Sequence, residues 1–382
     1  MPDTHAVLSP SSSARWLSCT PSARLCAEKE DKTSEYTIQG SSAHALAEYK
    51  LKKSLGQPTE NPTENLTYFD KEMDDCTDSY QQYVIEKLTE IKQMCKDPVV
   101  LVEQKLDFSK YVPDSFGTAD CVIVADDTLT VIDLKYGVGI LVDAEQNTQM
   151  MLYALGALIM FDGIYDIETV TMTIFQPRRD NVSSFSMRKS ELIDWAENVL
   201  KPKAELAYNG EGEFKAGSHC QFCKVKATCR KRAEYNLELA KYDFEMPDSL
   251  EDDEIEIVLS KADEFISWLG DVKEYALNQA LQGKQWKDYK LVEGRSNRKY
   301  KNESAAAKIV EDAGFDPYEH KVLGITAMTK MLGKTKFNEL LGDFIEKPQG
   351  KPTLVPMSDK RPTMKNTAKE DFKEEIYNGK VQ

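Results

Sequence analysis

The sequence predicts an α/β (α+β) fold, in which a mixed central sheet is flanked by helices and followed by a mainly helical C-terminal extension. Three observations predict it. Short runs rich in β-branched residues follow Pro98, Gly117 and Asp127, and further runs cover 169–176 and 182–187. Long stretches of helical periodicity stand before, between and after these runs. With 382 residues, of which 41% are hydrophobic and 30% charged, the chain is long enough to bury a substantial core.

Composition excludes some classes of function. The net charge of −15 argues against a protein that coats nucleic acid by bulk electrostatics, although a local basic lining is enough for an enzyme acting on DNA. No apolar segment follows a basic stretch at the N-terminus, so we expect no signal peptide. The longest apolar stretch, Met150–Phe161, is too short to span a bilayer. We therefore expect a soluble, cytoplasmic protein whose 8 cysteines are thiols or metal ligands.

Two β-rich runs joined by the turn Asp126–Asp127 predict a hairpin. The first run carries Asp120, and the second ends in Ile132-Asp133-Leu134-Lys135. Because side chains alternate along a strand, Asp133 and Lys135 face the same side. If the hairpin pairs in register, Asp120 lies beside them, and two carboxylates and an ammonium group share one cleft.

Further polar residues fall on neighbouring elements. Gln149 and Tyr153 are four residues apart in a helix predicted over 144–160 and so share one face, although such a pair is also typical of core packing. His44 is placed in the first turn of a helix predicted from Gly40 to Leu55, with Ser41 or Ser42 as its cap; a solvated helix-end histidine is the alternative. Glu103 follows the strand that begins at Val99 and is either a cleft carboxylate or an ordinary charged strand end.

Together these motifs resemble the PD-(D/E)XK nuclease superfamily. Asp120 stands for its first acidic residue and Asp133-Leu134-Lys135 for its D/E-x-K element, while Gln149-x-x-x-Tyr153 and Gly40…His44 resemble motifs of the RecB-like branch. The resemblance implies a restriction-endonuclease-like core.

The resemblance also implies metal-dependent phosphodiester hydrolysis. Asp120, Asp133 and the carbonyl of Leu134 would hold Mg²⁺ or Mn²⁺, with His44 and Glu103 completing the metal shell. Lys135 would orient or deprotonate the attacking water. Gln149 and Tyr153 would position the DNA strand near its end.

A cysteine cluster is the second signal. Cys220-x2-Cys223-x5-Cys229 supplies three closely spaced thiols, which in a cytoplasmic chain usually bind metal. A fourth ligand must come from elsewhere, and Cys19 ends a helix predicted near the N-terminus, with Trp16 and Leu17 as its apolar anchors. This set resembles the 4Fe–4S staple of AddB-type and CRISPR-adaptation nucleases. Zn²⁺ completed by His219 or Cys19 is the alternative, and the remaining thiols are expected to be ordinary: Cys26, Cys76, Cys95 and Cys121.

Basic residues gather in two places. Lys224, Lys226 and Arg230 lie around the cluster, and Arg295 and Arg298 lie in a basic, aromatic-rich segment from Lys284 to Lys301 with a strand predicted at Trp286–Val292. Both suit contact with DNA, and both also suit a solvated surface.

We expect three parts: a nuclease core closed by the cysteine cluster over 1–232, a mainly helical subdomain over 233–347, and an extended or disordered tail over 348–382. The subdomain includes helices predicted at Ser304–Ala313 and, with a Thr326 cap, at Thr326–Ile345. The tail sequence KPTLVPMSDKRP resembles the end of an uncharacterised phage and prophage family of the superfamily.

The sequence thus predicts a Mg²⁺- or Mn²⁺-dependent deoxyribonuclease, an exonuclease acting on linear DNA in phage recombination or DNA processing. A single-strand annealing or single-strand binding protein of the phage is the expected partner, no membrane is involved, and assembly of several copies of the chain remains open. The alternatives are a structure-specific endonuclease, a non-catalytic DNA-binding partner that kept the fold, and a metal-cluster scaffold or sensor.

Overall fold

The computed structural model describes residues 6–30, 34–161, 163–238, 250–293, 300–318 and 322–346. The chain divides into two compact units, Met1–Leu291 and Val292–Gln382. Each unit is described by itself.

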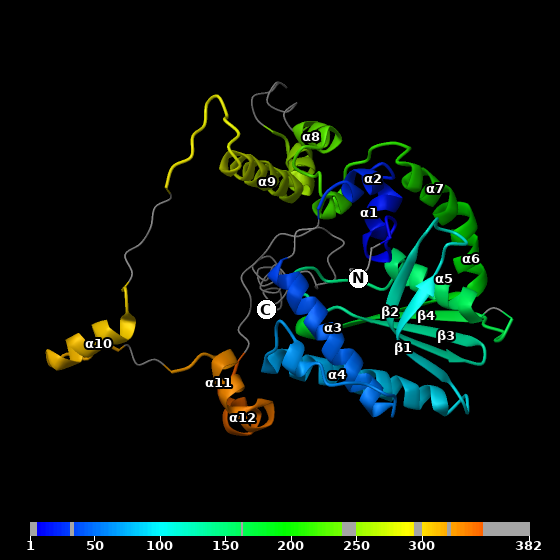
Figure 1. Cartoon of the computed structure of the whole chain (residues 1–382), viewed down its shortest axis with the longest axis horizontal. Helices are drawn as coiled ribbons and strands as arrows, with labels where there is room; N and C mark the ends of the chain where they lie inside the picture. Colours follow the sequence, from blue (N-terminus) through cyan, green and yellow to red (C-terminus); the bar gives the residue numbers. More distant parts are fainter. Residues whose placement is uncertain are drawn as a thin grey trace, which may run out of the picture. The chain divides into compact units, whose positions relative to one another are not determined.

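The first unit is built on one mixed sheet of five strands in the order β1-β2-β3-β4-β5 (Figure 1). The strands are β1 (Val99–Asp107), β2 (Phe116–Ala125), β3 (Thr128–Leu134), β4 (Thr169–Gln176) and β5 (Asn181–Arg188). Neighbours pair antiparallel except β3 and β4, which are parallel and are connected through helix α5 (Thr148–Phe161). The predicted α+β fold and the hairpin are confirmed, with Cys121 opposite Ile132 and Ala125 opposite Thr128.

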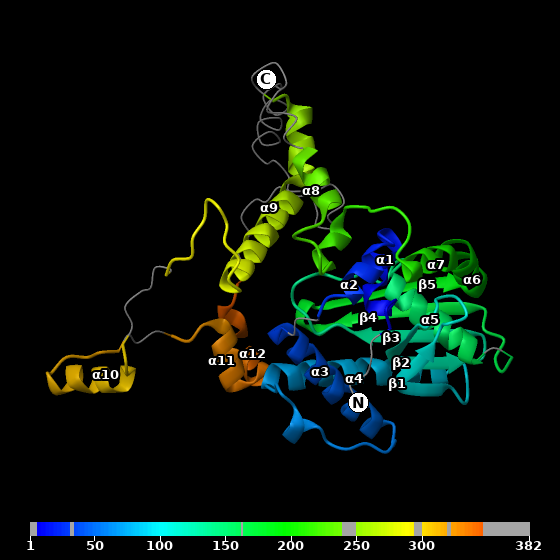
Figure 2. The ribbon, with the colours of Figure 1, turned by 45° about the horizontal axis from the view of Figure 1, so that its top comes forward.

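Helices cover both faces of the sheet, as Figures 1 and 2 show. On one face, α5 packs with the N-terminal helices and with α6 (Lys189–Trp195) and α7 (Lys201–Asn209) over inward-facing residues such as Val122 and Val131. On the other face, α3 (Glu35–Ser54) and α4 (Lys71–Lys92) pack over Ile123 and Ile132. The central strands are therefore buried on both sides, which explains why β2 reads as an almost continuous apolar run.

The other helices of this unit are α1 (Ser13–Ser18), α2 (Ser22–Ala27), α3 (Glu35–Ser54), α4 (Lys71–Lys92), α6 (Lys189–Trp195), α7 (Lys201–Asn209), α8 (Arg230–Leu237) and α9 (Asp252–Leu281). A buried ion pair fixes α9 to α8: the Arg232 side chain, which is 0% exposed, lies 2.6 Å from Glu264 and 2.5 Å from Asp271. As predicted, Cys19 ends α1, and Trp16 and Leu17 are buried.

Several helix starts differ from the prediction, and α5, predicted from residue 144, begins at Thr148. Helix α3 begins at Glu35 rather than Gly40, because the Ser34 hydroxyl accepts a hydrogen bond from the Thr37 amide and caps it earlier. Gly40 is then an interior position. In the same way the Asp70 carboxylate accepts a hydrogen bond from the Met73 amide and caps α4, which begins at Lys71.

The strand predicted at Trp286–Val292 is wrong. The structure has only an isolated bridge between Trp286 and Tyr289 there. A tertiary contact explains the difference. The Trp286 indole N–H donates to the carbonyl of Ala276 at 3.0 Å, and this hydrogen bond holds the segment against the end of α9 instead of in a strand. Arg295 and Arg298 lie outside the described residues.

The second unit contains α10 (Glu303–Asp312), α11 (Ile325–Leu332) and α12 (Lys334–Leu341). The single helix predicted over Thr326–Ile345 is divided, because Gly333 adopts φ 78° and ends α11. Thr326 is not its cap, since Gly324 takes the N-cap position. The expected tail, 348–382, lies outside the described residues.

Among the described residues, no helix has both the length and the apolar character needed to cross a membrane.

Candidate functional site

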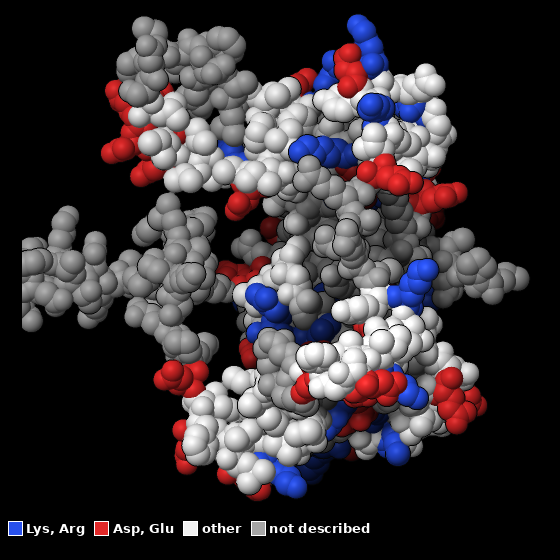
Figure 3. Space-filling model, turned by 90° about the vertical axis from the view of Figure 1, so that its left-hand side faces the viewer, with Lys and Arg blue, Asp and Glu red and all other residues white. Residues whose placement is uncertain are grey.

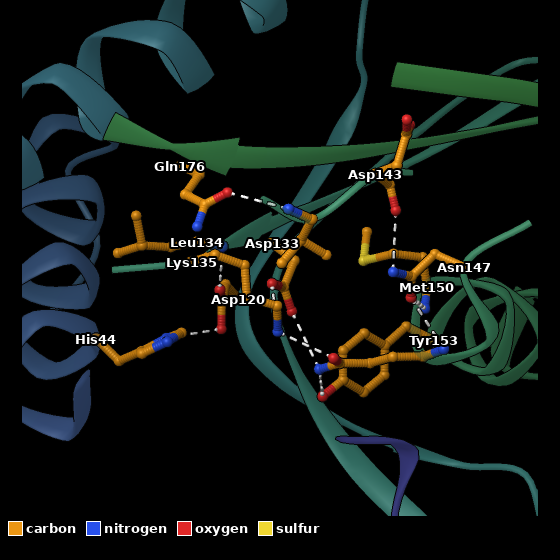
Figure 4. Close-up of polar contacts among 12 residues, drawn as sticks. His44, Asp120, Asp133, Leu134, Lys135, Asp143, Asn147, Met150, Tyr153 and Gln176 are labelled. Carbon is orange, nitrogen blue, oxygen red and sulfur yellow. Dashed lines mark hydrogen bonds and ion pairs between the residues drawn. The ribbon is translucent and has the colours of Figure 1, made fainter. Parts of the chain in front are cut away.

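The hairpin brings the three motif residues of β2 and β3 together (Figure 4). The Lys135 ammonium lies 2.9 Å from the Asp133 carboxylate. The Leu134 amide N–H donates to Asp120 Oδ2 at 2.6 Å, so the backbone at the end of β3 orients the carboxylate of β2. Asp120 and Asp133 are only 8% and 2% exposed. Two buried carboxylates and one ammonium group therefore share the carboxyl end of β3, the arrangement that the spacing predicted.

Two neighbouring elements add a histidine and a third carboxylate. His44 extends from α3, and its Nδ1 lies 3.0 Å from Asp120 Oδ1. Because α3 begins at Glu35, His44 is in the interior of the helix and not in its first turn. One ligand atom each from His44, Glu103 and Asp120 can be chosen so that all three lie within 4.8 Å of one another. Among the described residues this is the one group with metal-ligand spacing.

Glu103 reaches this group through a distortion of β1. It is an interior strand residue, not a strand end, and it adopts φ 52°, which costs about 1–3 kcal/mol for a residue other than glycine. Val102 pairs with Cys121 and Gln104 with Ala119, while the position between them, Glu103 opposite Asp120, is not paired. The strained backbone thus sits at the point where a carboxylate is added to the site.

The charges of this group depend on one another. The Asp120 carboxylate raises the pKa of His44 to about 9. Burial raises the pKa of Glu103 to about 8, and the negative Asp120 adds to this. Burial would also raise the pKa of Asp120, but the His44 charge and hydrogen bond and the Leu134 amide outweigh it and lower that pKa. Burial raises the pKa of Asp133 against the opposing pull of Lys135. Without a cation, His44 and Glu103 therefore retain their protons at neutral pH, while the Asp120 carboxylate stays charged.

Gln149 and Tyr153 lie one turn apart on α5, and Gln149 contacts both Lys135 and Asp133. The Gln149 side-chain oxygen accepts from Lys135 Nζ at 2.9 Å, and its amide nitrogen donates to Tyr153 Oη at 3.1 Å and to Asp133 Oδ1 at 3.4 Å. The helix is capped by the Asn147 carboxamide, which accepts from the amides of Gln149 and Met150. In this structure Gln149 holds the Asp133–Lys135 pair in place.

Tyr80 is a member of the site that sequence reasoning missed. It lies on α4, is 1% exposed and lines the same pocket as His44, Glu103 and Asp120. Its hydroxyl is buried and has no hydrogen-bond partner among the described residues. The signal in the sequence was only that of an aromatic residue on an amphipathic helix, which cannot be told from core packing.

The cysteines of the second signal line one pocket. Cys19 from the end of α1 joins Cys220, Cys223 and Cys229, although about 200 residues separate the first from the others. Cys26, expected to be an ordinary thiol, lies next to the pocket residue Cys223: its Sγ is 3.7 Å from Cys223 Sγ and accepts from the Lys224 amide. Its spacing from Cys19 matches no known motif, so this position could not be predicted from the sequence.

Cations surround these thiols. Arg15 is 7% exposed and Arg232 is fully buried, and both line the pocket. Arg232 Nη2 is buried without a hydrogen-bond acceptor in the described part of the chain. Hydrogen bonds with Cys19 and Cys220 raise the pKa of His219 to about 10, and a hydrogen bond with Cys223 lowers the pKa of Cys26 to about 6. The lining thus combines thiols with two buried guanidinium groups, of which Arg232 is also paired with Glu264 and Asp271.

The basic residues near this pocket are only partly available to DNA. Lys226 pairs with Asp271 at 2.7 Å, and Lys224 Nζ donates to the carbonyl of Lys29. Arg230, the first residue of α8, is exposed. On the face shown in Figure 3, acidic and basic side chains of the described residues are interspersed.

Comparisons with known proteins match this chain to one family and to a set of solved structures. The structure titled "Crystal structure of SSO0001" matches at 13% sequence identity, over 49% of this chain and 95% of that chain, with a TM-score of 0.21. A likeness of that size carries no argument about fold or function. The family match is extensive, since it runs over residues 5–362 and includes every site residue named above. The chain belongs to the family described as "Protein of unknown function (DUF2800)".

Proposed function

We propose that this chain is a divalent-metal-dependent deoxyribonuclease with a PD-(D/E)XK core, which hydrolyses phosphodiester bonds from the ends of linear DNA. The observation that carries the proposal is the meeting of Asp120, Asp133 and Lys135 at the end of β3, with His44 and Glu103 beside Asp120. An unrelated structural ion pair has no need of a third carboxylate on strained backbone.

The residues present fit a hydrated Mg²⁺ or Mn²⁺ ion. Carboxylate oxygens and an imidazole nitrogen are suitable ligands, and His44, Glu103 and Asp120 offer them within 4.8 Å of one another. Asp133 and the Leu134 carbonyl would add oxygen ligands. The unpartnered Tyr80 hydroxyl in the same pocket is explained if it hydrogen-bonds to a water on the ion, because a buried hydroxyl without a partner costs about 1–3 kcal/mol.

The chemistry divides between the ion and the chain. When bound, the ion polarises the scissile phosphate and lowers the pKa of a bound water. Lys135, held between Asp133 and Gln149, places one positive charge where negative charge develops on the phosphate oxygens. Gln149 accepts from that ammonium group and is itself held by the buried Tyr153, and the partly exposed Gln149 side chain also suits contact with the strand end.

The cysteine pocket fits a 4Fe–4S cluster held by Cys19, Cys220, Cys223 and Cys229. A cluster with four thiolates is anionic, and the buried Arg15 and the unpartnered N–H group of Arg232 match that charge. Zn²⁺ with His219 among its ligands is the alternative, favoured by the position of His219 between Cys19 and Cys220. In either case the group ties α1 to the segment before α8 and has a structural role.

The proposed biological setting rests on the resemblance of the motifs and of the sequence KPTLVPMSDKRP to a phage and prophage family. An end-dependent nuclease of this kind would act on linear DNA in the cytoplasm of a bacterial host, encoded by a phage or prophage, beside a single-strand annealing or single-strand binding protein. Several copies of the chain around one DNA would favour processive action.

The test compares end-labelled linear DNA with closed circular DNA, with Mg²⁺ or Mn²⁺ and with chelator, using protein purified anaerobically. We expect loss of label from linear DNA only, dependent on metal and abolished in Lys135→Ala. Lys87→Ala is the matched control, because Lys87 pairs with Glu90 on the exposed surface of α4. Nicked circles would instead establish a structure-specific endonuclease. Binding of DNA without any cleavage would leave a non-catalytic recombination partner.

A further inference from the structure

A loop beside the site exposes apolar side chains. Residues 135–147 connect the end of β3, with Asp133 and Lys135, to α5, with Gln149. Within this connection Val138, Ile140 and Leu141 are 37%, 50% and 52% exposed. We call these three residues the apolar loop tip. The connection begins and ends at residues of the proposed nuclease site, so the tip is tethered to that site from both sides.

The backbone of this loop is held firmly by one buried residue. Gln176, at the end of β4, is 1% exposed, and its Nε2 donates to the carbonyls of Gly137 at 2.9 Å and Ile140 at 2.8 Å. Its Oε1 accepts from the Val142 amide at 3.2 Å, as Figure 4 shows for Gln176. Asn181 adds a hydrogen bond to the Val142 carbonyl at 2.9 Å. The loop is therefore fixed at three successive points.

The loop combines a backbone held by hydrogen bonds with apolar side chains that are exposed to water. A flexible loop could turn such side chains toward the protein, but four hydrogen bonds from Gln176 and Asn181 hold this one outward. Contiguous exposed apolar side chains on a rigid support are typical of a contact surface. The hydrophobic effect would favour covering the tip, at about 25 cal/mol per Å² of apolar area removed from water.

The surroundings of the tip indicate what covers it. Arg179 is exposed, donates from Nη1 to the Val138 carbonyl at 3.2 Å, and has no carboxylate partner within the described ranges. Arg178 stacks over Tyr136 at the start of the loop and pairs with Glu72. A cation next to aliphatic side chains suits a nucleic-acid end, because phosphates pair with the cation while aliphatic side chains insert between bases.

We propose that the apolar loop tip is a wedge that contacts the terminal base pair of a DNA duplex, so that one strand separates and enters the metal site. This inference rests on the proposed nuclease function, and it assigns the substrate class: duplex ends whose last base pair must be opened. Ile140 and Leu141 form the apolar edge, Arg179 contacts a phosphate, and Gln176 maintains the shape of the loop.

The test uses the double variant Ile140→Ser/Leu141→Ser and three substrates of one sequence: a blunt duplex, a duplex with a mismatched end, and the single strand. We expect the double variant to cleave the blunt duplex roughly tenfold more slowly than wild type, which is the effect of about one lost apolar contact. Cleavage of the mismatched duplex and of the single strand should stay within about twofold. Leu206→Ser, an exposed leucine on α7, is the matched control.

A second readout does not require cleavage. With Ca²⁺ in place of Mg²⁺, binding of wild type to a duplex with 2-aminopurine at its end should raise the fluorescence of that base, and the double variant should not. An equal loss on all three substrates, or no loss on any, overturns the wedge while leaving the nuclease in place. A wild type that cleaves none of the three overturns the proposed function itself.

Discussion

At the scale of single residues, the site joins groups that the sequence marks to groups that it does not. Asp120, Asp133 and Lys135 were predictable because a two-residue period and a hairpin turn determine which side chains meet. For Glu103 the sequence left two interpretations open, a cleft carboxylate and a charged strand end. Its place in the site depends on a left-handed backbone conformation within β1, which the residue type does not predict. The role of Tyr80 could not be predicted, because its hydroxyl reaches the site only when α4 packs beside the elements that carry His44, Glu103 and Asp120.

Removing the unpartnered hydroxyl of Tyr80 should stabilise the metal-free protein but weaken its binding of Mn²⁺. In chelator, Tyr80→Phe should raise the free energy of unfolding by about 1–3 kcal/mol, because a buried hydroxyl without a partner is removed. The same change should weaken Mn²⁺ binding about tenfold, as the loss of a residue that supports bound ligands usually does. Calorimetric titration with Mn²⁺ and urea unfolding check the two parts.

Tyr83→Phe is the matched control for Tyr80. It lies on the same helix and its ring also packs against Phe175, at 5.0 Å, but it does not line the pocket. It should change neither quantity appreciably. Equal Mn²⁺ affinity in wild type and Tyr80→Phe would contradict a role of the hydroxyl at the metal site.

The raised pKa of His44 predicts a pH dependence of stability in metal-free protein. The folded state holds this proton more tightly than the unfolded chain, with a pKa near 9 against an ordinary 6.5. The charged imidazole therefore stabilises the fold fully below about pH 6.5, and this contribution is lost as the pH rises through about 9. In chelator, the difference in urea midpoint between wild type and His44→Gln should shrink from pH 6 to pH 9.5. A difference that grows over this range would reverse the assigned sign.

At the scale of elements, strong local patterns predicted the strands and several helices, whereas helix caps, one tertiary contact and one glycine conformation determined the boundaries that differ. The five strands and the helix carrying Gln149 were predicted because strand runs and helix periodicity are strong there. Helix starts were misplaced, since several Ser and Asp residues compete as caps and Ser34 and Asp70 prevailed. The strand expected at Trp286 failed because one indole hydrogen bond redirected the segment.

Two glycine substitutions should change the stability of the fold in opposite directions, because Gly117 is crowded by the N-terminal segment and Gly40 is not. An added Cβ at Gly117 would lie 2.6 Å from Pro10 Cγ and 3.0 Å from the Tyr153 ring, neither of which can move freely. Gly117→Ala should therefore lower the free energy of unfolding by about 1–3 kcal/mol. Gly40→Ala, in the interior of α3 with nothing within 4 Å, should raise it by about 0.5–1 kcal/mol. Urea unfolding measures both free energies. An unchanged free energy of unfolding in Gly117→Ala would show that the segment carrying Pro10 can shift to make room for the added methyl group.

At the scale of the whole molecule, distant parts of the chain are joined at the cysteine pocket. The three close cysteines were recognisable by spacing, and Cys19 was assigned through resemblance. Cys26 and the two buried arginines could not be inferred, because only the packing of α1 and α2 against the segment around Cys220 brings them there. The second unit carries no motif from which its helices could be placed. The division of its predicted long helix into α11 and α12 depends on the backbone conformation of one residue, Gly333.

The pocket predicts that metal content and stability are lost together. Cys229→Ser should reduce the iron or zinc bound per chain and lower Tm, because the link that closes about 200 residues is removed. Cys76→Ser, at a partly buried thiol outside the pocket, should change neither. Elemental analysis identifies the metal, and thermal unfolding measures the stability. Full metal content in Cys229→Ser would exclude it as a ligand.

The joining of the first helices to Cys220 also sets an order for assembly during synthesis. A chain grows from its N-terminus, so α1 and α2 leave the ribosome long before the partners that complete their pocket. Pro10 and Tyr153 both lie close to Gly117, and the turn at Pro10–Ser12 packs against α5, the helix of the proposed site. We therefore expect the site to reach its final packing after the chain has been made past Cys229, when every residue it needs is already present.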